Sequence, residues 1–338
     1  MLSNVLASPI KSDEQIVFFP TAARLSTDSL QWIVPIHAWV FESEDESLWR
    51  RATLSAFATG LGLDEGATDN EIFRERARWF LVDNEGGKTF KLTIWKEQAL
   101  GPSGDNGHLD TKLALQRRGD GEEPETFWLG YSAILPPGDQ REFDGDALFP
   151  GSAGLSVISD IDDTIKISDV TDKKALLANT FLKPFEAASG MVTTYRRLAG
   201  AGAVFHYVSS SPWQLYPALR EFMDASEFPL GSFHLKLFRL NDESFLNLFK
   251  SSRESKPPII EALLDAYPQR EFILIGDSGE HDPEIYGEIT RRHPERIRHI
   301  YIRKVTPETT KDDRYRDAFN GLPSSQWTLF EDAGVISP

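Results

Sequence analysis

The chain has 338 residues, which exceeds one ordinary domain, so we expect two compact units that each bury a core. The formal net charge of −16 opposes non-specific binding to nucleic acid or to an anionic membrane surface, because both require a basic face. Cysteine is absent, which excludes disulfides, thiolate metal sites and cysteine nucleophiles. Any metal must therefore be held by oxygen or by histidine.

No stretch of the sequence approaches the roughly 18 apolar residues that a membrane span requires. Residues 1–8 lack the basic region and the following apolar stretch that would form a signal peptide. We therefore expect a cytoplasmic protein that touches a membrane peripherally at most. The sequence sets no oligomeric state.

Residues 1–150 predict a mainly β domain that contains two helices. Apolar residues spaced by three and four predict helices over 47–61 and 70–81, and Asp69 or Asn70 would cap the second. Runs rich in β-branched and aromatic residues between turn formers predict strands. These runs are 16–20, 30–41, 89–95, 108–115 and 125–135.

The stretch from 136 to 154 is rich in Pro, Gly and acidic residues, which is typical of a connector. We place the domain boundary there, and expect residues 151–338 to form an α/β domain. Beyond it, apolar strands alternate with amphipathic helices, which predicts parallel strands joined by right-handed crossovers. The expected strands are 155–159, 204–208, 233–238, 272–275 and 298–302, and the expected helices include 184–199 and 257–267, the latter opened by its prolines.

Three carboxylates and a hydroxyl follow the first strand of this domain, where the site of an α/β sheet gathers. Asp160 and Asp162 lie two apart, so an extended backbone would project both to one side, with Thr164 next in the series. Two carboxylates held this close repel each other. The pair therefore requires a metal, a shared proton, or both.

Polar residues also follow other strands of the domain. Ser209 follows the second strand, and Asp277 and Asp282 follow the fourth. Lys256 stands at the entrance of the helix before the fourth strand. Together these residues supply a nucleophile, an acid/base, a hydroxyl donor, a cation and carboxylates for an oxygen-preferring metal such as Mg²⁺.

Each of these residues alone has an ordinary structural interpretation. Ser209 could be a turn serine, Lys256 a solvated lysine, and Asp282 the N-cap of a helix. His206 alternates with aromatic residues along a strand, which favours a packed histidine over a ligand, whereas His281 falls within the candidate metal loop. Only the ordered set indicates a functional site.

The set resembles the haloacid dehalogenase-like phosphatases. The Asp-x-Asp-x-Thr of residues 160–164, Ser209, Lys256 and the Gly-Asp-x-x-x-x-Asp of residues 276–282 occur in the order of that superfamily. Four ordered motifs, each at a strand end or a helix start, are more specific than any single one. The resemblance implies a haloacid dehalogenase-like parallel sheet flanked by helices.

A narrower resemblance is to the catalytic domain of the fungal actin-patch phosphatidate phosphatase and of its bacterial relatives. It is carried by residues 160–166, 211–213 and 275–286, and it covers roughly 155–305. The position of the β domain ahead of this region is also similar to the bacterial relatives.

The resemblance implies a role for each catalytic residue. Asp160 would be the nucleophile that becomes an aspartyl-phosphate, and Asp162 would act as general acid and then as base. Ser209 and Lys256 would hold the transferring phosphoryl group.

The resemblance also implies a Mg²⁺ site. Asp160, Asp277 and the backbone carbonyl of Asp162 would be ligands, and Asp282 would either complete that shell or orient Lys256. One departure is that many superfamily members have glycine where this chain has Asp163, although the phosphatidate phosphatase group resembles this chain.

The resemblance implies phosphatidate as substrate, with diacylglycerol and phosphate as products. Residues 165–202 are too short for a large cap domain and predict a flap and one helix, which leaves an open approach suited to a bulky substrate. The motifs do not read the leaving group, so a phosphatase for a soluble metabolite, a nucleotide or a phosphoprotein is an alternative. A catalytically silent binding or scaffold protein is another, although none of the motif residues is missing.

A phosphatidate phosphatase must meet an anionic surface, and the chain is acidic with no evident amphipathic basic helix. We therefore expect transient membrane contact through a small basic or aromatic patch. Trp213 could line the entrance of the substrate site or pack against the start of a helix, and the sequence favours neither. The candidates for the patch are Lys166, Lys173, Lys174, Trp213, Lys236 and Arg239.

Overall fold

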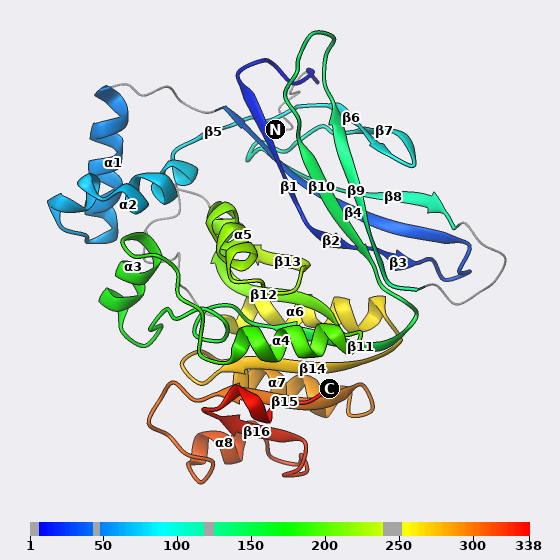
Figure 1. Cartoon of the computed structure of the whole chain (residues 1–338), viewed down its shortest axis with the longest axis vertical. Helices are drawn as coiled ribbons and strands as arrows, with labels where there is room; N and C mark the ends of the chain where they lie inside the picture. Colours follow the sequence, from blue (N-terminus) through cyan, green and yellow to red (C-terminus); the bar gives the residue numbers. More distant parts are fainter. Residues whose placement is uncertain (1–6, 43–47, 118–124, 239–251) are drawn as a thin grey trace, which may run out of the picture. The chain divides into compact units, whose positions relative to one another are not determined.

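The computed structural model describes residues 7–42, 48–117, 125–238 and 252–338. The chain divides into two compact units (Figure 1). The β-rich unit comprises Met1–Arg50, Leu81–Ser152 and Gly231–Phe233, and the α/β unit comprises Arg51–Phe80, Ala153–Leu230 and His234–Pro338.

The β-rich unit is built from two five-stranded sheets (Figure 1). In the first sheet the long strand β4 pairs with all four others: β1 (Glu14–Phe19), β3 (Arg24–Leu25), β4 (Gln31–Glu42), β5 (Asp83–Asn84) and β8 (His108–Gln116). The second sheet has the order β2-β10-β9-β6-β7, formed by β2 (Thr21–Ala22), β6 (Phe90–Ile94), β7 (Lys96–Leu100), β9 (Phe127–Ile134) and β10 (Asp144–Phe149).

A single hydrophobic core joins the two sheets of this unit. Alternate residues of β4 point into it, because successive side chains of a strand face opposite sides. Edge-to-face aromatic pairs cross between the sheets, with 5.1 Å between the ring centroids of Phe18 and Tyr131 and also between those of Trp32 and Phe149. The mainly β character predicted for this region is confirmed.

The sequence prediction missed β7 and β10, and it assigned the residues of β10 to a connector. Gly145 and the acidic residues around it look like turn formers. In the structure, however, the Tyr131 ring packs against Gly145, where a Cβ would lie only 2.5 Å from the ring. Gly145 therefore allows the Tyr131 ring to pack closely against the neighbouring strand, and it does not mark a turn.

The sheet of the α/β unit has six strands in the order β13-β12-β11-β14-β15-β16, although the first half of β13, Gly231–Phe233, is grouped with the β-rich unit. The pairs from β12 to β16 are parallel. The chain passes from the central strand β11 to β12 on one side, while β14 lies on the other. The carboxyl end of β11 is therefore a topological switch point, where α/β sheets open a crevice for ligands. The strands are β11 (Ala153–Ser159), β12 (Val204–Pro212), β13 (Gly231–Lys236), β14 (Gln269–Asp277), β15 (Ile297–Arg303) and β16 (Trp327–Phe330).

Helices cover both faces of this sheet (Figure 1). On β12, Phe205 stacks on Tyr195 of α4 (Met191–Gly200) at 5.3 Å, and the next residue, His206, stacks on Tyr267 at 5.5 Å. Because neighbouring strand residues face opposite sides, these two contacts lie on opposite faces. His206 is thus a packed histidine, as expected, and burial holds its pKa well below the usual value. The other helices here are α5 (Tyr216–Ala225), α6 (Ser252–Ala266), α7 (Asp282–Arg292) and α8 (Asp313–Ala318), with short 3₁₀ turns η3 (Trp213–Leu215) and η5 (Ala333–Val335).

The two helices predicted before residue 82 are present, but they group with the α/β unit and not with the β-rich unit. The side chain of Asn70 accepts a hydrogen bond from Phe73 N at 3.1 Å, so the predicted N-cap is confirmed. These helices are α1 (Leu48–Leu61) and α2 (Glu71–Ala77), accompanied by the 3₁₀ turns η1 (Glu65–Asp69) and η2 (Arg78–Phe80).

The partner of these helices is α3 (Lys173–Phe181), which the sequence prediction missed. The Phe181 ring lies 5.9 Å from that of Phe57 and 6.3 Å from that of Phe73, and all three side chains are buried. Arg76 donates to the carbonyl oxygen of Thr180 at 2.6 Å, at the carboxyl end of α3. This packing explains why α1 and α2 belong to the α/β unit.

Three other expectations for the α/β unit are corrected. Residues 165–202 form two helices, α3 and α4, instead of a flap and one helix, and α4 begins at Met191. Strand β16 was not predicted. Helix α6 begins at Ser252, so its prolines lie inside the helix and do not open it, and Lys256 lies within the helix instead of at its entrance.

Removing an aromatic ring between α2 and α3 should loosen the α/β unit alone. We expect Phe73→Ala to lower the free energy of unfolding of this unit by about 3–5 kcal/mol, because a fully buried ring is lost. Hydrogen exchange followed by mass spectrometry should then show faster exchange in α3. The matched control is Phe90→Ala in the β-rich core, which should accelerate exchange in β6 and β9. Faster exchange in those strands with an unchanged α3 in Phe73→Ala would contradict the assignment.

Candidate active site

Asp160 directly follows β11 and is almost fully buried. Its Oδ1 accepts from Lys256 Nζ at 2.8 Å, and its Oδ2 accepts from Thr164 Oγ1 at 3.1 Å. The backbone turns after the strand, since the amides of Ile165 and Lys166 both donate to the carbonyl of Ile161. This turn, and not the predicted alternation of an extended chain, brings the Thr164 hydroxyl to Asp160.

Lys256 lies at the centre of the site, with only 1% of its surface exposed. Besides Asp160, its Nζ contacts Asp282 Oδ1 at 2.6 Å and Glu280 Oε2 at 3.3 Å. Burial alone would lower the pKa of this lysine, but the three carboxylates hold it well above the ordinary value. Sequence reasoning missed Glu280, although it lies within the Gly-Asp-x-x-x-x-Asp motif.

Asp277 and Asp282 are fixed by the loop that connects β14 to α7. Asp277 Oδ1 accepts from the amides of Gly279 and Glu280 at 2.5 and 3.1 Å, whereas its Oδ2 is buried without a hydrogen-bond partner. Asp282 Oδ2 accepts from the amide of Asp277 at 3.2 Å. A Cβ at residue 276 would overlap the Asp282 carboxylate, which explains the glycine of the motif.

Asp282 does not cap helix α7. The N-cap is His281, whose side chain makes no capping hydrogen bond, and Asp282 is the first residue of the helix. Both oxygens of its carboxylate are instead directed to Lys256 and to the amide of Asp277. The N-cap interpretation is therefore wrong, and the contact with Lys256 is one of the two roles that the motif resemblance implied.

One group of carboxylates could hold a metal ion. Within the described residues, ligand oxygens of Asp160, Asp277 and Asp282 all lie within 4.8 Å of one another. The unpaired Oδ2 of Asp277 fits this use, because a buried acceptor without a partner is otherwise costly. Burial raises the pKa of Asp160 and of Asp277, and a hard cation bound by oxygen would lower both again.

Asp162 lies in a separate network. Its Oδ1 pairs with Lys166 Nζ at 2.7 Å and accepts from Ser168 Oγ, and its Oδ2 accepts from Ser211 Oγ at 2.7 Å and from Ser209 Oγ at 3.3 Å. Burial would raise the pKa of Asp162, but Lys166 and the hydroxyls outweigh it and lower the pKa to about 2. Its carboxylate is outside the metal group, so its role there would be through its carbonyl, as the resemblance implies.

The two aspartates of the first motif have separate lysine partners. Asp160 pairs with Lys256 and Asp162 pairs with Lys166, and both lysines are buried. This arrangement resolves the repulsion between the carboxylates with two protein cations. Sequence reasoning missed Lys166 and Ser168 as partners of Asp162.

The turn after Asp162 is held by the side chain of Asp163. This residue has a φ of +52°, a conformation that favours glycine. Its carboxylate accepts from the amides of Ser168, Asp169 and Val170 at 2.8, 2.9 and 2.6 Å. The departure from the superfamily glycine is thus offset by three hydrogen bonds that order the following loop.

The proposed membrane patch is partly corrected. Lys166 is buried beside Asp162, and Trp213 is also buried, so neither can dock a surface. Lys173 and Lys174 are exposed on α3, and Lys236 is half-buried on β13. Arg239 lies outside the described residues.

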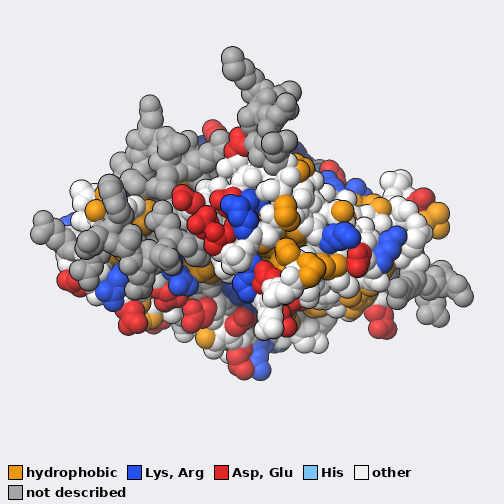
Figure 2. All heavy atoms as spheres, turned by 90° about the horizontal axis from the view of Figure 1, so that it is seen from above, with side chains coloured by type: hydrophobic (Ala, Val, Ile, Leu, Met, Phe, Trp, Pro, Cys, Tyr) orange, Lys and Arg blue, Asp and Glu red, His pale blue; other side chains and the backbone are white. Residues whose placement is uncertain are grey.

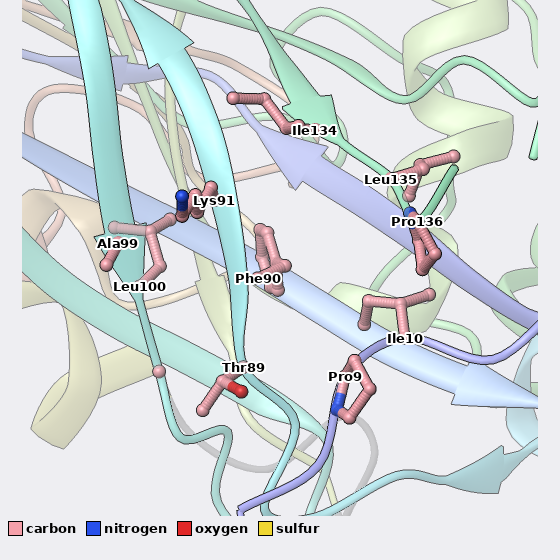
Figure 3. A pocket seen from close by; sticks show the side chains of 11 residues that line it. Pro9, Ile10, Thr89, Phe90, Lys91, Ala99, Leu100, Ile134, Leu135 and Pro136 are labelled. Atoms are coloured by element: carbon pink, nitrogen blue, oxygen red, sulfur yellow. The ribbon is translucent and has the colours of Figure 1, made fainter.

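The β-rich unit has a groove of about 560 Å³, shown in Figure 3. Its lining is mostly apolar, with Ile10, Phe90, Leu100 and Leu135 pointing into it and Lys91 at one side. None of the predicted site residues contributes to this groove, which is separate from the carboxylate site.

Residues 155–304 match the family model described as "Phosphatidate phosphatase APP1, catalytic domain". Every residue of the carboxylate site falls inside that match. This match covers less than half of the chain. The resemblance inferred from the motifs over 155–305 is thereby confirmed.

Two fungal proteins are similar to the same part of the chain. "Phosphatidate phosphatase APP1" of Saccharomyces cerevisiae is 38% identical over 154 residues, which cover 44% of this chain and 26% of that protein. An uncharacterized protein of Schizosaccharomyces pombe is 34% identical over 156 residues, covering 45% of this chain and 25% of that protein. The chain thus spans about a quarter of the length of the curated relatives it matches.

Among solved structures, a sialyltransferase from Photobacterium damsela aligns with 64% of this chain and 37% of its own at 8% identity and a TM-score of 0.23. A 2,6-sialyltransferase from Photobacterium sp. JT-ISH-224 aligns with 96% of this chain and 50% of its own at 9% identity and a TM-score of 0.27. Scores this low support no conclusion about fold or function.

Removing the cation beside Asp162 should destabilise the protein in a pH-dependent way. We expect Lys166→Met to cost about 3–5 kcal/mol of unfolding free energy at pH 7, because it leaves a buried carboxylate unpaired. The pKa of Asp162 should then rise from its value of about 2, so the penalty should shrink on lowering the pH to 4, where the carboxyl takes up a proton. Urea denaturation at the two pH values measures this.

The double variant Asp162→Asn with Lys166→Met should recover part of the lost stability. Lys183→Met, which removes an exposed lysine from the same segment, is the control and should stay near the wild-type value. An equal penalty for Lys166→Met at both pH values would show that Asp162 does not depend on this lysine.

Proposed function

We propose that the α/β unit is a phosphomonoester hydrolase of the haloacid dehalogenase-like kind, with Asp160 as its nucleophile. The observation that carries this proposal is the buried cluster in which Asp160 pairs with Lys256 and lies near the carboxylates of Asp277 and Asp282. The match of this region to a phosphatase catalytic domain supports the reaction class. A nucleophilic carboxylate, a buried cation and spare carboxylate oxygens are what phosphoryl transfer through an aspartate requires.

Mg²⁺ is the proposed cofactor. The carboxylates of Asp160, Asp277 and Asp282 are buried and close together, the partly exposed carboxylate of Glu280 also contacts Lys256, and this one lysine offsets only part of their charge. An octahedral, oxygen-preferring cation would be held by Asp160 and Asp277, with Asp282 next to them. When bound, it would neutralise phosphoryl oxygens so that an anionic nucleophile can approach an anionic substrate.

The residues of the chain would then divide the reaction as follows. An oxygen of Asp160 attacks phosphorus and the bond to the leaving alcohol breaks, which gives an aspartyl-phosphate. Water then attacks phosphorus and regenerates the Asp160 carboxylate. Lys256 and Ser209 hold the phosphoryl oxygens in both steps, the lysine as a charge and the serine as a hydroxyl donor.

Asp162 would move the protons. With a pKa of about 2 it is ionised at neutral pH, which suits it to accept a proton from the attacking water. In the first step it must instead donate one to the leaving alcohol. A phosphate dianion beside its carboxylate favours that proton uptake, because a like charge raises the pKa.

Replacing the nucleophile should abolish turnover without unfolding the protein. We expect Asp160→Asn to lower the rate of p-nitrophenyl phosphate hydrolysis by at least about 1,000-fold, because the aspartyl-phosphate can no longer form. The circular dichroism spectrum should be unchanged. EDTA should stop the wild-type reaction and Mg²⁺ should restore it.

The exposed variant Asp224→Asn is the matched control for this experiment and should keep full activity. Near wild-type turnover by Asp160→Asn would end the aspartate mechanism. A complete absence of Asp160-dependent hydrolysis in the wild type would favour a silent scaffold. The assembled pairs Asp160–Lys256 and Asp162–Lys166 argue against that alternative.

Phosphatidate is the proposed substrate, with diacylglycerol and phosphate as products. The name of the matched family and that of the yeast relative support it. The chain between β11 and β12 forms two helices, α3 and α4, and no separate cap domain, which is compatible with a bulky lipid. Soluble metabolites, nucleotides and phosphoproteins are the alternatives that share the same chemistry at phosphorus.

Contact with a lipid surface would be transient. No helix in the described ranges is both long and apolar enough to pass through a bilayer. Figure 2 shows Lys and Arg in small groups interspersed with Asp and Glu on the face that it displays. The exposed residues Lys173 and Lys174 of α3 remain as the docking pair, because weak binding to an anionic surface needs only a few cations.

If the substrate is a lipid, substitutions should be able to weaken binding to the lipid surface without changing the hydrolysis of a soluble phosphoester. Turnover of phosphatidate in detergent micelles should exceed that of soluble phosphomonoesters in the presence of Mg²⁺. Replacing both Lys173 and Lys174 by Glu should weaken binding of the protein to the micelles while leaving hydrolysis of p-nitrophenyl phosphate unchanged. Reversal of the exposed Arg196 and Arg316 to Glu is the control for charge alone. A strong preference for a sugar phosphate, a nucleotide or a phosphopeptide would overturn the lipid assignment.

A further inference from the structure

The loop that carries Asp277 and Asp282 is anchored by a segment that lies beyond the family match. The match ends at residue 304. Arg314, on helix α8, donates from Nη1 to the carbonyl of Ser278 at 2.5 Å and from Nη2 to the carbonyl of Glu280. It also forms a two-point contact with the Glu284 carboxylate, at 2.7 and 3.2 Å.

A second set of hydrogen bonds holds the same loop from the end of β15 and from the residues just after it. The buried hydroxyl of Ser278 accepts from the amides of Val305 and Thr306 at 2.9 and 3.0 Å. The amide of Ser278 donates to the carbonyl of Arg303 at 3.0 Å. The Ser278 side chain is therefore attached to residues that follow β15, and the Ser278 amide is attached to the last residue of that strand.

The contact of Arg314 with Ser278 bears directly on the candidate metal ligand. The carbonyl of Ser278 and the amide of Gly279 belong to one peptide unit, which is planar and rigid. The guanidinium holds the oxygen end of this unit, and the nitrogen end donates to Asp277 Oδ1 at 2.5 Å. The orientation of the Asp277 carboxylate, and the position of its unpaired Oδ2, thus depend on Arg314.

The contact with Glu280 acts in the same way on the other half of the loop. Its carbonyl belongs to the peptide unit that leads into His281 and Asp282, while its side chain lies 3.3 Å from Lys256. One planar fork with five donors can reach both carbonyls and a carboxylate together, which a lysine cannot do. The loop therefore requires arginine at this position.

We propose that Arg314 is a positioning residue for the metal site, and that residues 305–318 are a working part of the active site although they lie outside the family match. Arg314 touches neither the phosphoryl group nor the reacting atoms. It fixes the peptide planes that aim Asp277 and Asp282. The proposal rests on the proposed function, because it assumes that these carboxylates bind Mg²⁺.

The test compares Arg314→Gln with Arg316→Gln in the full chain. Arg316 lies on the same helix and pairs with Asp313 at the exposed surface, so its replacement removes the same charge without touching the loop. Isothermal titration calorimetry with MgCl₂ measures the affinity. The Mg²⁺ concentration for half-maximal hydrolysis of p-nitrophenyl phosphate gives a second value.

We expect Arg314→Gln to weaken Mg²⁺ binding and to raise the half-maximal Mg²⁺ concentration by about 10-fold, the lower end of the effect of losing a direct hydrogen-bond partner of a metal ligand, because Arg314 acts through the peptide units. The KM for p-nitrophenyl phosphate at saturating Mg²⁺ should be unchanged, because the phosphoryl contacts are intact. Arg314→Lys should recover part of the affinity at most, and Arg316→Gln should match the wild type.

Unchanged Mg²⁺ affinity in Arg314→Gln, with only a lower unfolding midpoint, would overturn the proposal and reduce Arg314 to a structural role. If Arg314→Gln does not fold, Glu284→Gln removes the carboxylate that holds the Arg314 guanidinium and should shift Mg²⁺ affinity in the same direction. No shift in Glu284→Gln would also overturn the proposal.

A wild type that binds Mg²⁺ but hydrolyses no phosphomonoester would refute the proposed function, while the calorimetric comparison would still decide the role of Arg314. A wild type that binds no Mg²⁺ would refute both.

Discussion

The structure of the site depends on one buried ionic contact, that of Lys256 with Asp160, Asp282 and Glu280. Charges removed from water are stable only when they are paired at short range and their remaining hydrogen bonds are satisfied. The parallel sheet provides this pairing by placing the carboxyl ends of β11 and β14 side by side. Helix α6 then brings the lysine to the same edge.

Parallel topology also explains which part of the site the sequence could predict. Asp160 follows β11, Ser209 lies in the last part of β12 and Asp277 ends β14. All parallel strands end at one edge, so strand assignment alone brings these residues together. Lys166 and Ser168, the other partners of Asp162, could not be predicted in this way. Their positions depend on the turn at Asp163, whose positive φ is visible only in the structure. The sequence alone predicts a surface position for Lys166, because an isolated lysine is seldom buried.

Apolar periodicity predicts that a helix or strand exists. It does not predict where the element packs when its partner lies far away in the sequence. The helices before residue 82 were found from their apolar spacing, but that spacing does not reveal which surface an apolar face contacts. Their partner proved to be Phe181 of α3, far along the sequence, and so they belong to the α/β unit. Strand β10 was missed for a similar reason, because Gly145 is required by the Tyr131 ring on β9.

The two lysines give the two motif aspartates different environments before any substrate binds. Lys166 keeps Asp162 ionised, whereas burial among carboxylates raises the pKa of Asp160 despite Lys256. In the proposed reaction, Lys256 must exchange part of its contact with Asp160 for the incoming phosphoryl oxygens. The contact seen here would therefore be the resting state, in which Lys256 balances the charge of the nucleophile. Asp282 keeps its own hydrogen bond to Lys256, so the lysine would remain in place during that exchange.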